Sequence, residues 1–348
     1  MGIDYDEIKR SLQSFFNKGT LTIVGSGLSC AEGIPGMGDL AKKLLQEVPN
    51  MINVERNTTW SNIVKSLENN KGLEEALHEN KPDEDLEDVI LYITSRYIRE
   101  AEKEVIDNVI AGNKEFRFSK YIRKMHIPNS GLPIITTNYD RLIEFSCELA
   151  GVPVDNMFFG RSIAMLDENK SSLSFCKGIK SKTRDRVQLS YHKRIKIFKP
   201  HGCLGWFDYN GTPVSTSLNL KAKNLIITPG LNKFRAGYEQ PFDIHREKAN
   251  KAIDEASKYI IIGYGFNDDH LETHLIDRIK RGVPTLIITR TLSENTIRII
   301  SENTNVLAIS HSIKNKFDEG TLFQGNGKSV FLKNIDLWDL GEFIEEVF

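Results

Sequence analysis

The sequence has 348 residues with 46 basic and 47 acidic side chains, which leaves a formal net charge of −1. This length is sufficient for one large domain with a sizeable core, or for two smaller domains. The balanced charge argues against extensive nucleic-acid binding, and four widely separated cysteines without a C-x-x-C pair argue against a zinc ribbon.

The N-terminal stretch "MGIDYDEIKRSLQSFF" is charged and amphipathic, and it lacks the apolar centre of a secretory signal peptide. No apolar run in the sequence reaches the ~18 residues that a membrane-spanning helix needs. We therefore expect a cytoplasmic protein that neither enters a membrane nor binds nucleic acid directly.

Short apolar runs alternate with helical stretches along most of the chain, after an amphipathic helix expected over 5–17. The runs that read as buried strands are 20–27, 132–140, 195–202, 224–230, 258–266, 284–290 and 305–310. The clearest helical stretches between them are 241–257, 268–281 and 291–303. Continuous apolar strands that alternate with helices predict a parallel sheet covered on both faces. We therefore expect an α/β, Rossmann-like fold with helices on both faces and an inserted helical module.

Three segments depart from this alternation within the single domain expected for 1–348. Residues 41–125 are rich in charge and carry apolar side chains at helical spacing, which predicts a helical insertion. Residues 152–194 are irregular and basic, so we expect a small lobe or a loop there. Residues 312–348 predict a C-terminal extension made of a strand and a helix that dock on the body.

The stretch "GSGLS" follows the first predicted strand. Gly25 and Gly27 permit a tight turn and a close approach to a pyrophosphate, and the helix start behind them supplies free N–H groups. The dehydrogenase fingerprint has a third glycine where this chain has Cys30, and no acidic residue closes a second strand about 20 residues later. This departure weakens the hydride-transfer interpretation, and an ordinary strand-to-helix turn remains an alternative.

Polar side chains follow the next two strands at their carboxyl ends. Asn138 and Asp140 lie in "TTNYD", and His201 lies in "KPHG". Ligands of open parallel sheets bind outside the carboxyl ends of the strands, so these side chains are predicted on the same rim as the glycine turn. Taken singly, Asn138 could cap a helix, Asp140 could favour its first turn, and His201 could be a core histidine. Taken together, they favour a functional site.

These motifs resemble those of the sirtuins, in particular the divergent bacterial sirtuin-like proteins. The matching stretches, in order, are "GSGLSCAEGIP", "TTNYD", "KPHG" and "IIIGYGFNDDHL". The resemblance implies that Asn138 and His201 are the catalytic pair and that Asp140 helps to orient the nicotinamide ribose or its amide. The residues that it implies for NAD+ binding are Gly25, Ser26, Gly27, Ser29, Pro35, Gly263, Gly265, Phe266 and Asn267, with Thr289 and Arg290 as weaker candidates.

Departures from the family pattern narrow the activity that the resemblance implies. Protein deacetylases of the family carry a four-cysteine zinc module, which this chain cannot build, and a Phe-Arg pair where Gly36, Met37 and Gly38 stand here. Thr137 replaces a glutamine, and the sequence shows no clear acyl-lysine channel. The resemblance is therefore to NAD+-cleaving effectors, which release nicotinamide and ADP-ribose and deplete NAD+ in bacterial anti-phage defence.

Two other functions remain open. One is an NAD-dependent protein deacylase or ADP-ribosyltransferase, and the other is a non-catalytic nucleotide-sensing scaffold. NADP+ as the substrate and a cyclic product also remain open. The resemblance further implies a homo-oligomer, or a regulatory partner such as a HerA-type ATPase, with 41–125 as the place for such contacts.

A pair of histidines four residues apart, His270 and His274, raises the question of a metal site. The H-E-x-x-H motif is absent, and a solvated helix face is the favoured interpretation. We therefore expect no zinc or other metal, and the resemblance implies NAD+ as the substrate.

Overall fold

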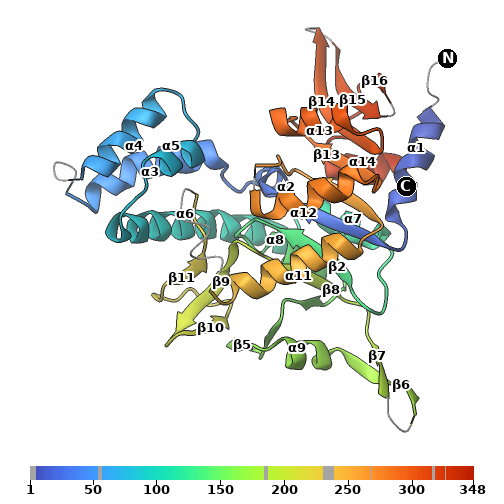
Figure 1. The fold of residues 1–348 in the computed structure, drawn as a ribbon, viewed down its shortest axis with the longest axis horizontal. Helices are drawn as coiled ribbons and strands as arrows, with labels where there is room; N and C mark the ends of the chain where they lie inside the picture. Colours follow the sequence, from blue (N-terminus) through green and yellow to red (C-terminus); the bar gives the residue numbers. More distant parts are fainter. Residues whose placement is uncertain are drawn as a thin grey trace.

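The computed structural model describes residues 5–53, 57–183, 187–229, 239–267, 269–315, 318–325 and 327–348. Its centre is a nine-stranded sheet in the order β16-β15-β14-β13-β12-β1-β2-β8-β3 (Figure 1). In this order the strands are β16 (Lys328–Lys333), β15 (Asp318–Gly325), β14 (Val306–Asn315), β13 (Thr285–Thr289), β12 (Lys258–Ile262), β1 (Thr20–Val24), β2 (Leu132–Thr136), β8 (Ile195–Phe198) and β3 (Val154–Asp155). Pairing is parallel from β14 to β3. The predicted α/β fold class is thereby confirmed.

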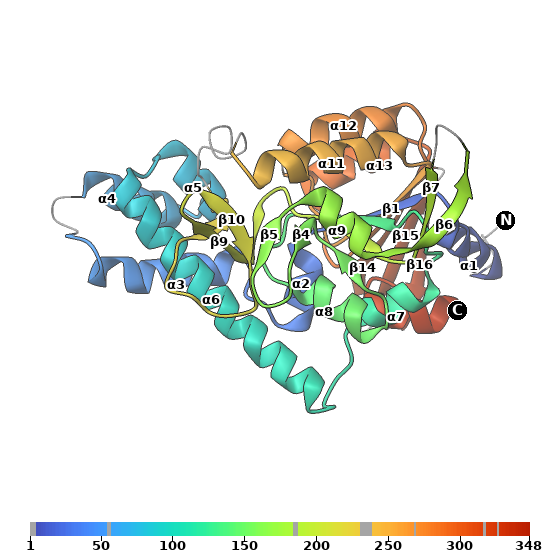
Figure 2. The ribbon, with the colours of Figure 1, turned by 90° about the horizontal axis from the view of Figure 1, so that it is seen from below.

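Helices cover both faces of this sheet, with one hydrophobic cluster on each side. Figure 2 shows α11 (Phe242–Glu255), α12 (Asp269–Lys280) and α13 (Glu294–Glu302) on one side of the strands and α7 (Arg117–Lys124) and α8 (Leu142–Leu149) on the other. Successive strand residues alternate between the clusters, because side chains along a strand point to opposite faces. Both faces of the sheet are therefore buried, which explains the continuous apolar runs in the sequence.

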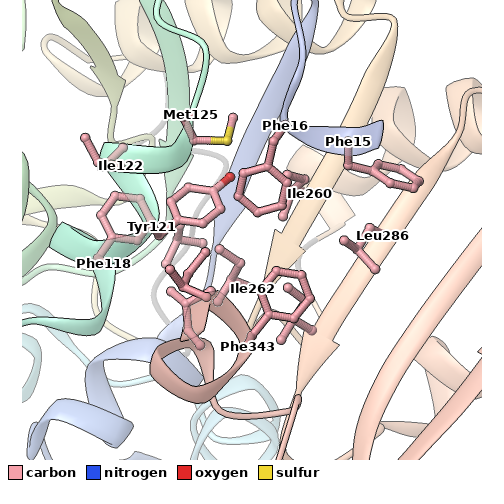
Figure 3. Close-up of a cluster of buried hydrophobic side chains, with 14 of the residues drawn as sticks. Phe15, Phe16, Phe118, Tyr121, Ile122, Met125, Ile260, Ile262, Leu286 and Phe343 are labelled. Carbon is pink, nitrogen blue, oxygen red and sulfur yellow. The ribbon is translucent and has the colours of Figure 1, made fainter. Parts of the chain in front are cut away.

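The cluster on the α7 side is drawn in Figure 3, where Phe16, Tyr121 and Phe343 pack around Ile260 and Ile262 of β12. It also receives α1 (Tyr5–Gln13), a short 3-10 turn (Ser14–Phe16) and α14 (Leu340–Val347). The amphipathic helix expected at the N-terminus and the helix expected at the C-terminus thus both dock on the sheet.

A group of helices lies at one end of the molecule, away from the C-terminal strands (Figure 1). It comprises α3 (Met37–Glu47), a 3-10 turn (Val48–Asn50), α4 (Thr58–Glu68), α5 (Leu73–Glu79) and the long α6 (Glu84–Ile110). These helices share a core of their own, which includes Leu44, Trp60 and Ile90. The last helix within 41–125, α7, instead packs on the sheet through Phe118 and Tyr121. The division of 41–125 as a separate insertion stays a prediction.

A second sheet of five strands lies beside the first, in the order β11-β9-β10-β5-β4. Its strands are β11 (Asn224–Ile226), β9 (Gly202–Tyr209), β10 (Thr212–Ser215), β5 (Ala164–Leu166) and β4 (Phe158–Phe159). The prediction that 224–230 adds a strand to the parallel sheet was wrong, because β11 pairs antiparallel with β9. The Asn224 side-chain amide donates to the carbonyls of Leu204 and Trp206 and holds β11 there.

Two further segments are more regular than the sequence suggested. Residues 152–194 carry α9 (Glu168–Ser174) and a hairpin of β6 (Cys176–Lys182) and β7 (Val187–Tyr191), in addition to short strands. At the C-terminal end, β15 and β16 extend the central sheet as an antiparallel meander before α14. Within the part of the chain that is described, no helix is both long and apolar enough to cross a bilayer.

Candidate active site

A cavity of about 200 Å³ opens at the carboxyl ends of the central strands. Eight of the residues predicted from the sequence line it, namely Ser26, Ser29, Pro35, Asn138, Asp140, His201, Gly265 and Asn267. The structure thus brings the amide, the carboxyl and the imidazole together with the start of α2 (Ser26–Glu32) and the turn after β12. Gly25, Gly27, Gly263 and Phe266 are not among the lining residues.

The glycines of the first turn hold two turns of the backbone against each other. The Gly25 N–H donates to the Ile262 carbonyl and the Gly27 N–H donates to the Gly263 carbonyl, each at 2.9 Å. A Cβ on Gly25 would lie 2.5 Å from the Gly263 oxygen, and one on Gly27 would lie 2.8 Å from the Gly263 Cα. Only glycine permits this approach. The N–H groups of Gly25 and Gly27 already have backbone acceptors, so close packing of the two turns is one reason for these glycines.

The predicted adenosine end is only partly at the cavity. Phe266 is fully buried and packs edge-to-face on Tyr264, with ring centroids 5.3 Å apart. Tyr264, which sequence reasoning missed, lines the cavity in its place. The weaker candidates lie elsewhere: Thr289 donates to the carbonyl two residues on, and the Arg290 guanidinium lies 5.5 Å from the Trp338 ring centroid.

Asn138 is buried at the end of β2 with its side-chain orientation fixed. Its Nδ2 donates to the Gly25 carbonyl at 2.9 Å and to the Ser29 hydroxyl oxygen at 2.8 Å. A carbonyl can only accept, so the NH₂ group must face Gly25. The Asn138 Oδ1 makes no hydrogen bond within the described residues, and it remains available to accept one from a ligand or a water.

Asp140 is also buried, with its Oδ1 accepting the Leu142 N–H at 3.2 Å. Burial raises the pKa of this carboxyl to about 6, although the positive charge of Lys199 and a hydrogen bond from Ser29 favour its ionised form. Lys199 is fully buried and its Nζ bonds the Glu144 carboxylate at 2.9 Å. Ser29 therefore links Asn138 to Asp140, and Lys199 adds a positive charge behind them.

His201 is half-buried at the cavity, and the chain around it is fixed on both sides. Its carbonyl accepts the Ile227 N–H at 2.9 Å. Just upstream, the Lys199 N–H donates to Nδ1 of the fully buried His245 at 3.2 Å. Burial, together with the charge of Lys199, lowers the pKa of His245 to about 3, so this second imidazole is neutral and acts as a structural acceptor.

The helical region supplies part of the cavity wall, which sequence reasoning missed. The contributing side chains are Met37 and Leu40 of α3, Glu74 of α5 and Ile98 of α6. An ion pair between the buried Glu102 of α6 and the partly exposed Arg141 ties this region to the segment after β2, because Glu102 accepts from the Arg141 guanidinium at 2.6 Å and from the Arg141 N–H at 2.6 Å. The residue that precedes Arg141 is Asp140, so α6 fixes the backbone beside the site.

Metal-ligating side chains do not gather in the described residues, where no group of three or more His, Cys, Asp or Glu could hold an ion. Of the histidine pair considered from the sequence, His274 lies with Nδ1 3.3 Å from Asp254. The side chain of His270 lies outside the described residues.

Comparison with known proteins places these residues in a known domain type. Residues 133–302 match the model of the SIR2-like domain, a range that includes Asn138, Asp140 and His201. A sirtuin solved for the structural basis of sirtuin substrate affinity is similar at 14% identity and a TM-score of 0.41, over 99% of this chain and 98% of that chain. A Sir2 structure with a p53 peptide and NAD+ is similar at 12% identity and a TM-score of 0.38, over 99% and 97%. The comparison with curated proteins returned no match.

Proposed function

We propose that this chain, whose residues 133–302 match the SIR2-like domain, is an NAD+ glycohydrolase, which cleaves NAD+ to nicotinamide and ADP-ribose. One observation carries the proposal. A single cavity at the carboxyl edge of the parallel sheet contains the side chains of Asn138, Asp140 and His201, beside the turn that begins α2. This edge is where open α/β sheets bind nucleotides.

The reaction depends more on positioning of the substrate and the water than on acid catalysis. The nicotinamide ring of NAD+ carries a positive charge and departs as a neutral molecule. The C1′–N bond therefore breaks without protonation of the leaving group. A water oxygen forms the new bond to C1′ and gives up one proton. The protein must hold the ribose and the water in line, and this orientation can supply much of the rate.

Asn138 and His201 suit these two tasks. The free Oδ1 of Asn138 can accept a hydrogen bond from a ribose hydroxyl or from the water. His201 faces the same cavity and can take the proton of the water, since a neutral imidazole is a base near pH 7. General-base help of this kind is worth about 10²–10⁴ in rate.

Asp140 supports the site in a different way. Its buried carboxyl receives the Ser29 hydroxyl, which in turn accepts from Asn138. We propose that it orients the nicotinamide ribose or the amide of the substrate directly or through this chain. Pro35, Gly265 and Asn267 line the same cavity and are proposed to contact NAD+.

The experiment that tests this function follows nicotinamide and ADP-ribose by chromatography after the protein is incubated with NAD+ alone. Release without an acceptor supports hydrolysis. Release that requires an acetylated-lysine peptide would instead indicate a deacylase or an ADP-ribosyltransferase. Tight binding of intact NAD+ without turnover would indicate a nucleotide-sensing scaffold. A parallel incubation with NADP+ decides between the two dinucleotides.

We further propose, on the resemblance alone, that the activity depletes NAD+ in bacterial anti-phage defence and is controlled by self-assembly or by a protein partner. Specific activity measured over a wide range of protein concentration tests the control. Activity that rises with concentration supports assembly, whereas full activity of a dilute monomer contradicts it.

A further inference from the structure

We propose that a second cavity, at the amino-terminal edge of the central sheet, binds a phosphate-bearing small molecule through Lys196. This proposal does not depend on the activity at the first cavity. The second cavity has a volume of about 390 Å³. It lies among the starts of β1, β2 and β8 and beneath one face of α11, with Thr20, Leu132, Lys196 and Lys248 among its lining residues.

The two cavities lie at opposite ends of the same strands. Thr20 begins β1 and lines the second cavity, whereas Ser26 follows the end of β1 and lines the first. The same holds for Leu132 and Asn138 at the two ends of β2. A ligand in the second cavity is therefore separated from the catalytic rim by the length of the strands, about 16 Å for five residues.

Most charged groups around the second cavity already have partners. Asp155 receives the Arg194 guanidinium at 3.2 Å and the Ser171 hydroxyl at 2.7 Å. Glu168 pairs with Lys248 at 2.7 Å. These carboxylates are therefore neutralised by nearby donors.

Lys196 and Lys18 stand apart, because neither has an acidic partner within 4.0 Å among the described residues, while both line the cavity. A third lysine, Lys251, makes only a long, exposed contact of 3.8 Å with Glu255. Such a contact is worth little in water. The cavity thus offers one half-buried cation and two more cations near it that are free to turn inward.

The Lys196 side chain is held in this cavity rather than extended into water. It shares the α11 face of β8 with Phe198, since Ile195 and Ile197 point to the opposite cluster. Its aliphatic stem lies on Gly131, where an added Cβ would be 3.0 Å from the Lys196 Cγ. Burial, together with the nearby charges of Arg194 and Lys248, lowers the pKa of Lys196, and the carboxylates of Asp155 and Glu168 offset this lowering only in part.

A half-buried ammonium without a directly paired carboxylate is unfavourable, and an anion in contact with it would relieve this cost. Lysine binds phosphate as a point charge, and three lysines around one cavity favour a multiply charged anion over a single carboxylate. The volume leaves room for more than one phosphate group. Inorganic pyrophosphate and ADP therefore serve as probes for the two sources of this chemistry, a free polyphosphate and a phosphorylated metabolite.

The test uses the full-length protein and a readout confined to the second cavity. The lysines are acetylated with N-hydroxysulfosuccinimide acetate, and the rate at each lysine is followed by peptide mass spectrometry. We expect millimolar pyrophosphate or ADP to slow acetylation of Lys196 about tenfold while exposed Lys193 reacts as before, since a bound anion covers the Lys196 amine and holds it protonated. ADP that protects at lower concentration than pyrophosphate identifies a phosphorylated metabolite, and the reverse order identifies a free polyphosphate.

Matched variants complete the experiment, with protection of Lys251 as the readout. We expect Lys196→Arg to keep this protection, Lys196→Met to lose it and Lys193→Met to behave as the wild type. If Lys196→Met does not fold, the wild-type protection and Lys196→Arg still decide the matter. Absence of protection by either probe in the wild type, or equal loss in Lys193→Met, overturns the proposal.

Discussion

Asn138 and Ser29 share a hydrogen bond of 2.8 Å between Nδ2 and Oγ, which joins the end of β2 to α2. Ser29 in turn donates to Asp140, so a single hydroxyl couples the amide and the carboxyl of the site. Because all three side chains are buried, each hydrogen bond lost leaves a polar group without a substitute from water.

Ser29→Ala should therefore destabilise the protein by about 1–3 kcal/mol and lower NAD+ turnover, since Asn138 loses one of its two anchors. Urea unfolding and a nicotinamide-release assay measure the two effects. Ser301→Ala is the control, because the exposed Ser301 hydroxyl bonds a carbonyl of its own helix and should matter little. Equal stability of Ser29→Ala and the wild type would show that the hydrogen bonds of Ser29 do not contribute to the free energy of unfolding.

Asp140 gives the stability a distinctive dependence on pH. Its pKa rises from 3.8 in the unfolded chain to about 6 in the folded protein, so between these values the folded state binds more protons. The free energy of unfolding contributed by this group is highest below pH 4 and falls as the pH rises through 6. Asp140→Asn removes this pH-dependent loss of unfolding free energy, which amounts to about 3 kcal/mol.

Urea unfolding of the wild type and Asp140→Asn at several pH values measures the difference. The stability of the variant relative to the wild type should increase between pH 4 and pH 7. Exposed Asp208→Asn is the control for the loss of one carboxyl. Parallel stability curves for the wild type and Asp140→Asn would contradict the raised pKa.

The contact between the turns at Gly25 and Gly263 makes a contrasting pair of glycine substitutions informative. Gly25→Ala places a Cβ 2.5 Å from a backbone oxygen, so the turns must separate, at a cost of roughly 1–3 kcal/mol and with loss of NAD+ affinity. Gly38→Ala meets nothing within 4 Å inside α3 and should stabilise the helix by up to about 1 kcal/mol. Thermal unfolding and NAD+ titration compare the two, and similar effects would refute the steric argument.

The ion pair between the buried Glu102 and the partly exposed Arg141 should anchor the helical region to the site. Glu102→Ala leaves the guanidinium without its partner and should cost about 3–5 kcal/mol, whereas Glu102→Leu with Arg141→Leu should recover much of this. A double-mutant cycle in urea measures the coupling. The exposed pair of Lys103 and Asp107 on the same helix is the control, with a coupling below about 1 kcal/mol expected. Additive effects of the Glu102 and Arg141 substitutions would show that the two side chains have no coupling energy and do not anchor the helical region.

The sequence was sufficient to predict Asn138, Asp140 and His201 on one rim, because each follows an apolar run and the carboxyl ends of parallel strands meet at one edge. It was not sufficient for contacts between distant elements. The pairing of Glu102 with Arg141 spans 39 residues, and no local pattern encodes such a contact.

The misplaced strand has a similar cause. The run at 224–230 is as apolar as the strands of the parallel sheet, and only the side-chain amide of Asn224 and the pairing with β9 put its described part in the other sheet. In the glycine turn, a local pattern has a structural cause that the sequence does not reveal. The motif is typical of phosphate binding, but its glycines are partly explained by packing against Gly263.

The most direct test of the proposed activity is the rate of nicotinamide release from NAD+, without any acceptor, in the wild type, His201→Ala and the exposed control His192→Ala. We expect turnover in the wild type and in His192→Ala, and a rate lower by a factor of about 10²–10⁴ in His201→Ala with the fold retained. Equal rates in all three proteins would place the chemistry elsewhere and contradict the assignment of His201.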